Sequence, residues 1–273
     1  MRATTGAPSR RGGAVALVVL AVLAASCGSG KFASGTTPGG PNFGAPTTTE
    51  PGSGPAGADR IPVPPGEMKS LATPVPILTL AGAVARFTAV KAPVPANGPP
   101  LTADGKPQIA AFMAEYCPYC GPVSWALVVA LAEFGKFSSL HFIRSSTQDI
   151  YPGTPMLSFY GSQYTSSYLT FSPYEIQNVH RKPLQNPPAP MINVWKSGTA
   201  GQTNVPYITL GGQAQLSASQ FSPGQLQGRG YSTIVNAIRT GRGVGAEIDT
   251  AAYFLVQSIC ETLQVRAPAC VAT

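Results

Sequence analysis

The sequence predicts one folded domain of the α/β class. A near-continuous apolar stretch of strand length, residues 108–116, leads directly into Cys-Pro-Tyr-Cys at residues 117–120. Apolar residues then keep helical spacing from 123 to 137, and residues 140–144 are the next strand candidate. The predicted order is therefore strand, Cys-X-X-Cys, helix, strand. Hydrophobic residues make up 44% of the chain, which suffices for one core of ordinary size.

Residues 1–26 are organised like a lipoprotein signal peptide. A basic and polar start precedes an apolar run at residues 14–25, which is too short for a membrane-spanning helix of about 20 residues. The small residues 24–26 resemble a bacterial lipobox, which implies cleavage before Cys27 and a diacylglycerol on its thiol. The alternative is an ordinary secretory signal with Cys27 as an incidental thiol, and the export route stays open. In both cases we expect an exported protein, which the lipid would anchor at the extracytoplasmic face of the cell membrane.

Residues 27–66 are predicted to form a disordered tether. Residues 28–58 contain 9 Gly, 5 Pro, 3 Ser and 5 Thr. Such a segment buries too little apolar surface to fold and behaves as a flexible linker. Proline-rich sequence continues through residues 61–65, so the folded domain is expected at residues 67–273.

The charge balance disfavours nucleic acid as a partner. The 18 Lys and Arg exceed the 11 Asp and Glu by 7, but the basic residues are dispersed, and three of them lie within the first 11 residues. No basic run with interleaved aromatic residues is present, and so small an excess neutralises few phosphates. We therefore expect no nucleic-acid binding.

The Cys-X-X-Cys motif favours thiol chemistry. At the start of a helix, unpaired N–H groups and the macrodipole stabilise a thiolate, so we expect a lowered pKa for Cys117 and a role as attacking sulfur. Cys120 is within disulfide reach and would resolve a mixed disulfide on Cys117. A structural disulfide or a degenerate site is the alternative. Zinc is disfavoured because there is no second Cys-X-X-Cys and only two His are present. We therefore expect neither a metal nor a cofactor.

The residues around the motif resemble the thioredoxin superfamily. Its F-x-A-x-aromatic-C-x-x-C-x-P run is matched by Phe112, Ala114, Glu115, Tyr116, Cys117, Cys120 and Pro122. Pro118-Tyr119 is similar to the glutaredoxin dipeptide, and Val205-Pro206 resembles the superfamily's Val-cisPro. The resemblance implies a cis bond that faces the cysteines, and substrate contacts from these four residues. It further implies a thiol-disulfide oxidoreductase that acts on protein thiols and disulfides, with an unidentified redox partner in the membrane.

Residues 147–203 are expected to form an insertion of hairpin and loop between the Cys-X-X-Cys helix and the cis-Pro strand. They are rich in Tyr, Ser, Thr, Pro and Gly, with strand-like pieces at 157–162 and 168–176. This Tyr-rich pattern is similar to an uncharacterised thioredoxin-like family, domain of unknown function 929, over about residues 70–265. The resemblance implies a thioredoxin-like fold with a β/loop insertion. Because loops rich in Tyr, Ser and Gly make adaptable contact surfaces, a non-catalytic binding lipoprotein with a structural Cys-X-X-Cys disulfide is the alternative function.

Two helices are predicted at about 231–240 and 246–264, with Cys260 at the end of the second helix and Cys270 at the end of the chain. In an exported protein these two cysteines are expected to form a structural disulfide, with a role as shuttle partner of the first pair as the alternative.

Three other titratable positions allow weaker predictions. Glu115 has two interpretations, proton transfer to Cys120 or an edge or surface carboxylate. His141 is expected to be a core or sheet residue, and residues 180–182 are expected to lie on a solvated loop.

Overall fold

The computed structural model describes residues 59–84 and 89–271, and it confirms the α/β class. The predicted signal peptide, Cys27 and most of the predicted tether lie outside the described residues. The elements are β1 (Ile61–Pro62), α1 (Pro65–Leu71), α2 (Ile77–Val84), β2 (Val94–Pro95), β3 (Thr102–Ala103), β4 (Lys106–Met113), α3 (Cys120–Ala132), β5 (Gly135–Arg144), β6 (Pro155–Ser166), β7 (Thr170–Glu175), α4 (Ala189–Gly198), β8 (Tyr207–Leu210), β9 (Ala214–Leu216), the 3-10 turn η1 (Pro223–Gln225), α5 (Tyr231–Thr240), α6 (Val244–Leu263) and α7 (Pro268–Val271).

In the described part of the chain, the central sheet has six strands, β2-β9-β8-β4-β3 in this order and β7, which also pairs with β4. Strand β4 pairs antiparallel with β8 and parallel with β7, and its last five residues are buried. Burial on both faces explains why its sequence is a continuous apolar run instead of an alternating pattern. The register pairs Met113 with Glu175, so the ends of β4 and β7 meet at one edge of the sheet.

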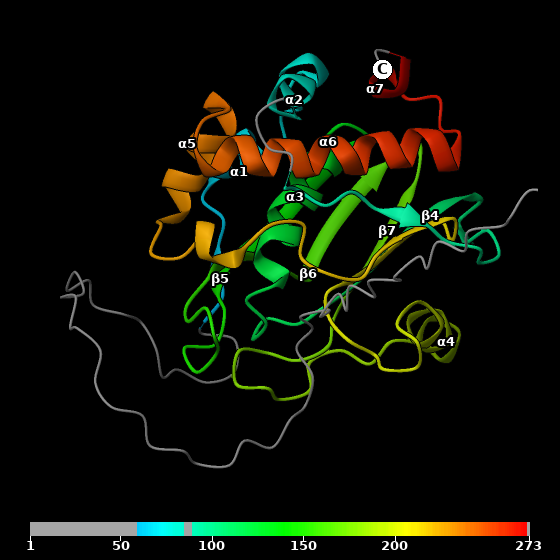
Figure 1. Cartoon of the computed structure of the whole chain (residues 1–273), viewed down its shortest axis with the longest axis horizontal. Coiled ribbons are helices and arrows are strands. Elements are labelled where there is room, and N and C mark those ends of the chain that lie inside the picture. The colour runs from blue at the N-terminus through cyan, green and yellow to red at the C-terminus, as the bar shows by residue number, and fades with distance from the viewer. Residues whose placement is uncertain (1–58, 85–88, 272–273) are drawn as a thin grey trace, which may run out of the picture.

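Helices cover both faces of this sheet, with α6 along one side and α4 on the other (Figure 1). Helix α3 lies on the α6 side, and all 13 of its residues are buried. On the α4 side, the ring of Phe112 stacks on Trp195 with centroids 4.9 Å apart and on Tyr174 at 5.2 Å. Side chains alternate along a strand, so residue 113, at the end of β4, belongs to the opposite, α3-facing side.

The prediction for residues 147–203 as hairpin and loop is wrong in two respects. Strand β7 joins the central sheet as the parallel neighbour of β4, whereas β5, which contains the predicted strand 140–144, pairs with β1 and β6 in a second sheet. The segment also contains helix α4, whose buried residues Met191 and Trp195 are four apart and face the sheet. Only two buried apolar residues mark this helix, which is too weak a periodic signal to predict it.

Ordered structure begins before residue 67, the predicted start of the domain. Ile61 and Pro62 pair with β5, the Val63 N–H donates to the Leu140 carbonyl at 3.0 Å, and α1 begins at Pro65. Proline is compatible with both places, because an edge strand and the first helical turn each leave some N–H groups without a partner.

The C-terminal part confirms the predicted disulfide. Cys260 on α6 and Cys270 on α7 are bonded, with Cα atoms 5.3 Å apart. The bond holds α7 against α6, where Ala267 and Ala269 are buried. Among the described helices, none combines the length and the apolar character needed to span a bilayer.

Candidate functional site

The two central cysteines lie where the sequence predicted them, at the start of a helix. Cys117 belongs to the loop that leaves β4, and Cys120 is the first residue of α3. Tight turns shape this loop: the Cys117 N–H donates to the Ala114 carbonyl and the Cys120 N–H to the Cys117 carbonyl, both at 3.1 Å. The sulfurs are therefore carried by a short, hydrogen-bonded segment at the edge of the central sheet.

Val205 and Pro206 lie opposite the first cysteine. Their peptide bond is cis, which confirms that prediction. The Cys117 thiol donates to the Val205 carbonyl with a sulfur–oxygen distance of 3.8 Å. This contact brings together two segments that are 88 residues apart in the chain. A backbone carbonyl just before β8 thus faces the sulfur that the sequence predicts as the attacking one.

Both sulfur-bearing residues are completely buried, at 0% exposure. Pro118 is also buried, and Tyr119 is half-buried with its ring edge-on to Tyr151 at a centroid distance of 5.8 Å. The loop 145–154 packs tightly on the first turn of α3, since a Cβ at Gly121 would lie 2.8 Å from the Thr154 methyl group. Both sulfurs are therefore shielded from solvent in this conformation.

A second covering segment crosses Tyr116, the residue before Cys117. The Arg181 guanidinium lies 3.9 Å from the centroid of the Tyr116 ring, and the same group forms a 3.1 Å ion pair with Asp149. Residues 180–182 are exposed, which confirms the predicted solvated loop, and Arg181 in addition packs on the Tyr116 ring. Its neighbour His180 is exposed, with Nε2 3.3 Å from the Asp59 carboxylate. Sequence reasoning missed Arg181 because its partners come from distant segments.

Glu115 is a buried ion-pair partner, so its interpretation as an edge or surface carboxylate is wrong. It is 1% exposed. Arg60 donates to both carboxylate oxygens, from Nε at 2.5 Å and from Nη2 at 2.9 Å, and the Ser158 hydroxyl donates at 2.5 Å. The Arg60 guanidinium also lies 4.5 Å from the ring centroid of Tyr160. Arg60 thus supplies the cation that pairs with the buried carboxylate two residues before Cys117.

Glu175 is a second buried carboxyl on the same side of the sheet, as its pairing with Met113 requires. Burial first, and the charge of Glu115 second, raise the pKa of Glu175 to about 8. One oxygen accepts from the Phe159 N–H at 2.9 Å, while Oε2 has no hydrogen-bond partner among the described residues. Nearby His141 lies in β5, as predicted for a sheet residue, and burial followed by the charge of Arg60 lowers its pKa.

The comparison with protein families agrees with the predicted resemblance. A family model described as "Domain of unknown function (DUF929)" matches residues 93–261. The chain belongs to the DUF929 family. No curated protein and no solved structure matches the chain.

The DUF929 match includes the cysteine pair, Val205-Pro206 and the covering residues Asp149 and Arg181, but it begins after Arg60. Arg60 and Glu175 were both missed by the sequence analysis. The one available signal for Glu175 was a carboxylate at the end of an otherwise uncharged strand-like segment. For Arg60 there was none, because it adjoins the predicted tether.

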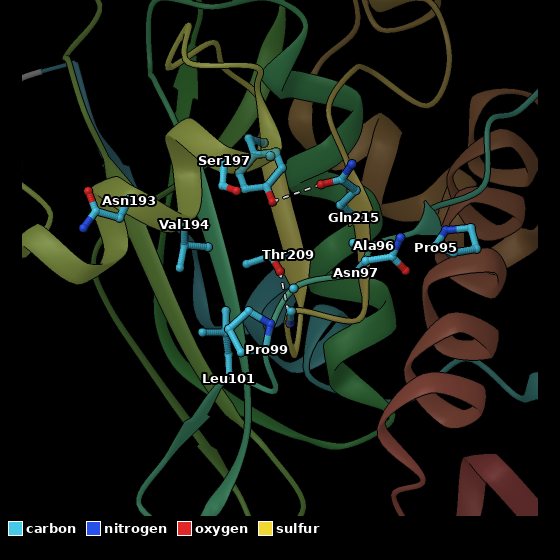
Figure 2. A pocket seen from close by; sticks show the side chains of 14 residues that line it. Pro95, Ala96, Asn97, Pro99, Leu101, Asn193, Val194, Ser197, Thr209 and Gln215 are labelled. Carbon is cyan, nitrogen blue, oxygen red and sulfur yellow. Dashed lines mark hydrogen bonds between the residues drawn. The ribbon is translucent and has the colours of Figure 1, made fainter.

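A pocket of about 560 Å³ lies elsewhere on this DUF929 protein, between α4, the segment 95–101 and strands β8 and β9 (Figure 2). It is lined by uncharged residues, and within it Tyr207 donates to Gln215 at 3.2 Å. Neither central cysteine lines it, so it does not belong to the thiol site. Within residues 59–84 and 89–271, no three His, Cys, Asp or Glu side chains are grouped so as to hold a metal ion.

Proposed function

We propose that this DUF929 protein is an extracytoplasmic, lipid-anchored thiol-disulfide oxidoreductase with a thioredoxin-like arrangement, acting on protein thiols and disulfides. The observation that carries the proposal is the 3.8 Å contact between the Cys117 sulfur and the Val205 carbonyl, next to the cis bond to Pro206. Anchoring through Cys27 and a redox partner in the membrane belong to the proposal on the sequence argument alone.

In the reducing direction, the Cys117 thiolate attacks one sulfur of a substrate disulfide. A mixed disulfide forms, and the other substrate sulfur leaves as a thiolate that takes up a proton. The Cys120 thiolate then attacks the Cys117 sulfur, which forms the intramolecular disulfide and releases the second substrate thiol. The substrate gains two electrons and two protons, and the protein loses them to it. Oxidation of a substrate dithiol is the same sequence in reverse. After the reducing reaction, a dithiol partner in the membrane would reduce the Cys117–Cys120 disulfide again; after the oxidising reaction, a quinone-type partner would reoxidise the two thiols.

Three features of the site support this chemistry. Cys117 lies next to the N-terminus of α3, where the positive end of the helix dipole favours a thiolate. The Val205 carbonyl, which accepts from the Cys117 thiol, is an acceptor for the backbone N–H of a bound substrate strand. Half-buried Tyr119 adds an aromatic contact at the rim, beside the more deeply buried Pro118.

The complete burial of both sulfurs favours a second candidate, a binding lipoprotein in which Cys117 and Cys120 only stabilise the fold. Its contact surface would come from the Tyr-rich segment 147–203.

Trapping of the mixed disulfide separates the two candidates. The full-length protein in detergent is incubated with a short unstructured peptide disulfide, and the covalent adduct is identified by mass spectrometry. We expect Cys120→Ser to accumulate a peptide adduct on Cys117, and Cys117→Ser to form none at Cys120 and to lose exchange activity. A Cys260→Ser/Cys270→Ser variant is the matched control and keeps its activity. Absence of any adduct in Cys120→Ser, or full activity of Cys117→Ser, would overturn the enzymatic function.

A further inference from the structure

We propose that Arg181 is a positioning residue that closes the dithiol site: its guanidinium, held between the Tyr116 ring and the Asp149 carboxylate, keeps Cys117 covered, and substrate reaches the sulfur when this contact opens. The statement about substrate rests on the proposed function. The closure itself is a property of the folded protein and can be measured without any catalytic activity.

The turn that carries Arg181 is built to hold that side chain in one place. Buried Asn178 accepts from the backbone N–H groups of both His180 and Lys182 at 3.0 Å through its side-chain oxygen. The Arg181 N–H donates to the Asn178 carbonyl at 2.9 Å, and the Gln177 amide donates to the Arg181 carbonyl at 2.9 Å.

Arg181 itself has a left-handed backbone conformation, with φ of 59°. Residues other than glycine adopt this conformation at a cost, and in folded proteins such positions are found where surrounding contacts over-determine them. The five-residue turn 178–182 therefore holds Arg181 in an unfavourable backbone conformation, and in this conformation the side chain lies on the ring of Tyr116.

Two covering segments meet on the residues that precede Cys117. From the first, the Gln177 carbonyl accepts from the Glu115 N–H at 2.9 Å, and Arg181 stacks on Tyr116. From the second, the Ser146 N–H donates to the Tyr116 carbonyl at 3.1 Å, and Asp149 follows three residues later. The Arg181–Asp149 ion pair joins these two segments to each other.

The closing contact is weak enough to open. The Arg181 side chain is 48% exposed, so water competes for its charge, whereas Asp149 is 15% exposed and Tyr116 is buried. With one exposed partner, the ion pair and the cation–π contact should each contribute about 1 kcal/mol or less to stability. Closure and opening therefore exchange easily, whereas Cys117 itself is 0% exposed when the site is closed.

The test measures the alkylation of Cys117 by iodoacetamide in the full-length, mildly reduced protein, with the modified residue identified by peptide mass mapping. Rates are compared at the alkaline plateau of the pH profile, where the thiol is fully ionised, so that a change in the pKa of Cys117 does not enter. We expect Arg181→Ala to raise the plateau rate about tenfold, and Arg181→Lys to raise it less because the charge is retained.

Two further variants distinguish loss of the Arg181–Asp149 contact from a general disturbance of the turn. Asp149→Asn retains the oxygen that accepts from the Ile150 N–H at 2.7 Å but removes the charge, and we expect a rate increase of about threefold. Lys182→Ala, in the same turn, leaves the closing contact intact and should stay within twofold of the unsubstituted protein. If Arg181→Ala lowers the midpoint of unfolding, the Asp149→Asn rate decides, since that substitution leaves the turn intact.

The inference is overturned if Arg181→Ala and Asp149→Asn both alkylate within twofold of the unsubstituted protein, or if Lys182→Ala accelerates alkylation as much as Arg181→Ala. These outcomes are distinct from failure of the proposed function. A protein that forms no peptide adduct in its Cys120→Ser form can still show an Arg181-dependent cover, and a protein that forms the adduct can lack one.

Discussion

The Cys117 sulfur lies 3.8 Å from the Val205 carbonyl oxygen and donates its hydrogen bond to it, although the two residues are 88 positions apart. The contact closes the edge of the central sheet where β4 ends and β8 begins. It joins the residue that would attack a substrate to the backbone that would hold it.

Cys117→Ser should separate chemistry from stability. A serine hydroxyl sits on a shorter bond than the thiol and does not reach the Val205 carbonyl, which lies 3.8 Å from the sulfur, so the buried hydroxyl should lower the free energy of unfolding by about 1–3 kcal/mol. Exchange activity should be lost, because the hydroxyl is not an effective nucleophile towards disulfides. Chemical denaturation and an exchange assay on one preparation check both. A larger loss of stability would mean that the sulfur has a structural role.

Arg60→Met should destabilise the protein by about 3–5 kcal/mol, because it leaves the Glu115 charge buried and uncompensated. Denaturant titration at pH 7 measures the loss. Adding Glu115→Gln should restore much of it, since no buried charge then remains. Lys69→Met on exposed α1 is the matched control, with an expected effect within about 0.5 kcal/mol. Equal effects of Arg60→Met and Lys69→Met would contradict the ion pair.

Stability should fall as pH rises from 5 to 8, and Glu175 should account for part of that fall. Its folded-state pKa of about 8 exceeds the ordinary 4.5, so the folded protein keeps a proton that the unfolded chain has released. The resulting stabilisation is complete below the unfolded pKa and is lost as pH rises towards 8, at about 1.4 kcal/mol per pH unit. Glu133 and Asp249, both with a pKa raised to about 7 by burial, act in the same direction. His141 opposes it, because burial lowers its pKa and its contribution is lost on acidification.

Glu175→Gln tests that assignment, because it imitates the protonated carboxyl and keeps an acceptor for the Phe159 N–H. The free energy of unfolding is measured at pH 5, 6.5 and 8. Between pH 5 and pH 8 it should fall by on the order of 3 kcal/mol less in Glu175→Gln than in the unsubstituted protein. Glu261→Gln, at an exposed position of α6, is the control. An unchanged pH dependence in Glu175→Gln would rule out the raised pKa.

Gly245→Ala should destabilise the packing of α5 on α6. A Cβ at this position collides with the carbonyl group of Ala237 and the backbone nitrogen of Ile238, which cannot move without shifting α5. Overpacking of this kind costs about 1–3 kcal/mol. Gly82→Ala in α2 meets nothing within 4 Å and should stabilise by about 0.5–1 kcal/mol through helix propensity. Thermal unfolding of the two variants should therefore shift in opposite directions.

Local features of this protein could be predicted from its sequence. Strand β4, the Cys-X-X-Cys at the start of α3, and helices α5 and α6 follow from periodicity and motif spacing within one segment. The disulfide of Cys260 and Cys270 joins residues only 10 apart, so the chain itself keeps the partners close. The cis bond before Pro206 and the DUF929 membership were implied by the resemblance of short motifs.

Other properties depend on which segments meet, and only the tertiary structure decided them. Because β7 pairs with β4, part of the expected insertion 147–203 belongs to the central sheet, and Glu175 lies close to Glu115. Pairing of β1 with β5 brought Arg60 to that pair, and a turn in which Arg181 has a positive φ placed its side chain on Tyr116. The hydrophobic pattern of a segment indicates which of its residues face the core and which face solvent. Whether a charged residue is buried and paired depends instead on partners that are distant in the sequence. For this reason the cysteines could be found in the sequence, while the residues that cover and surround them could not.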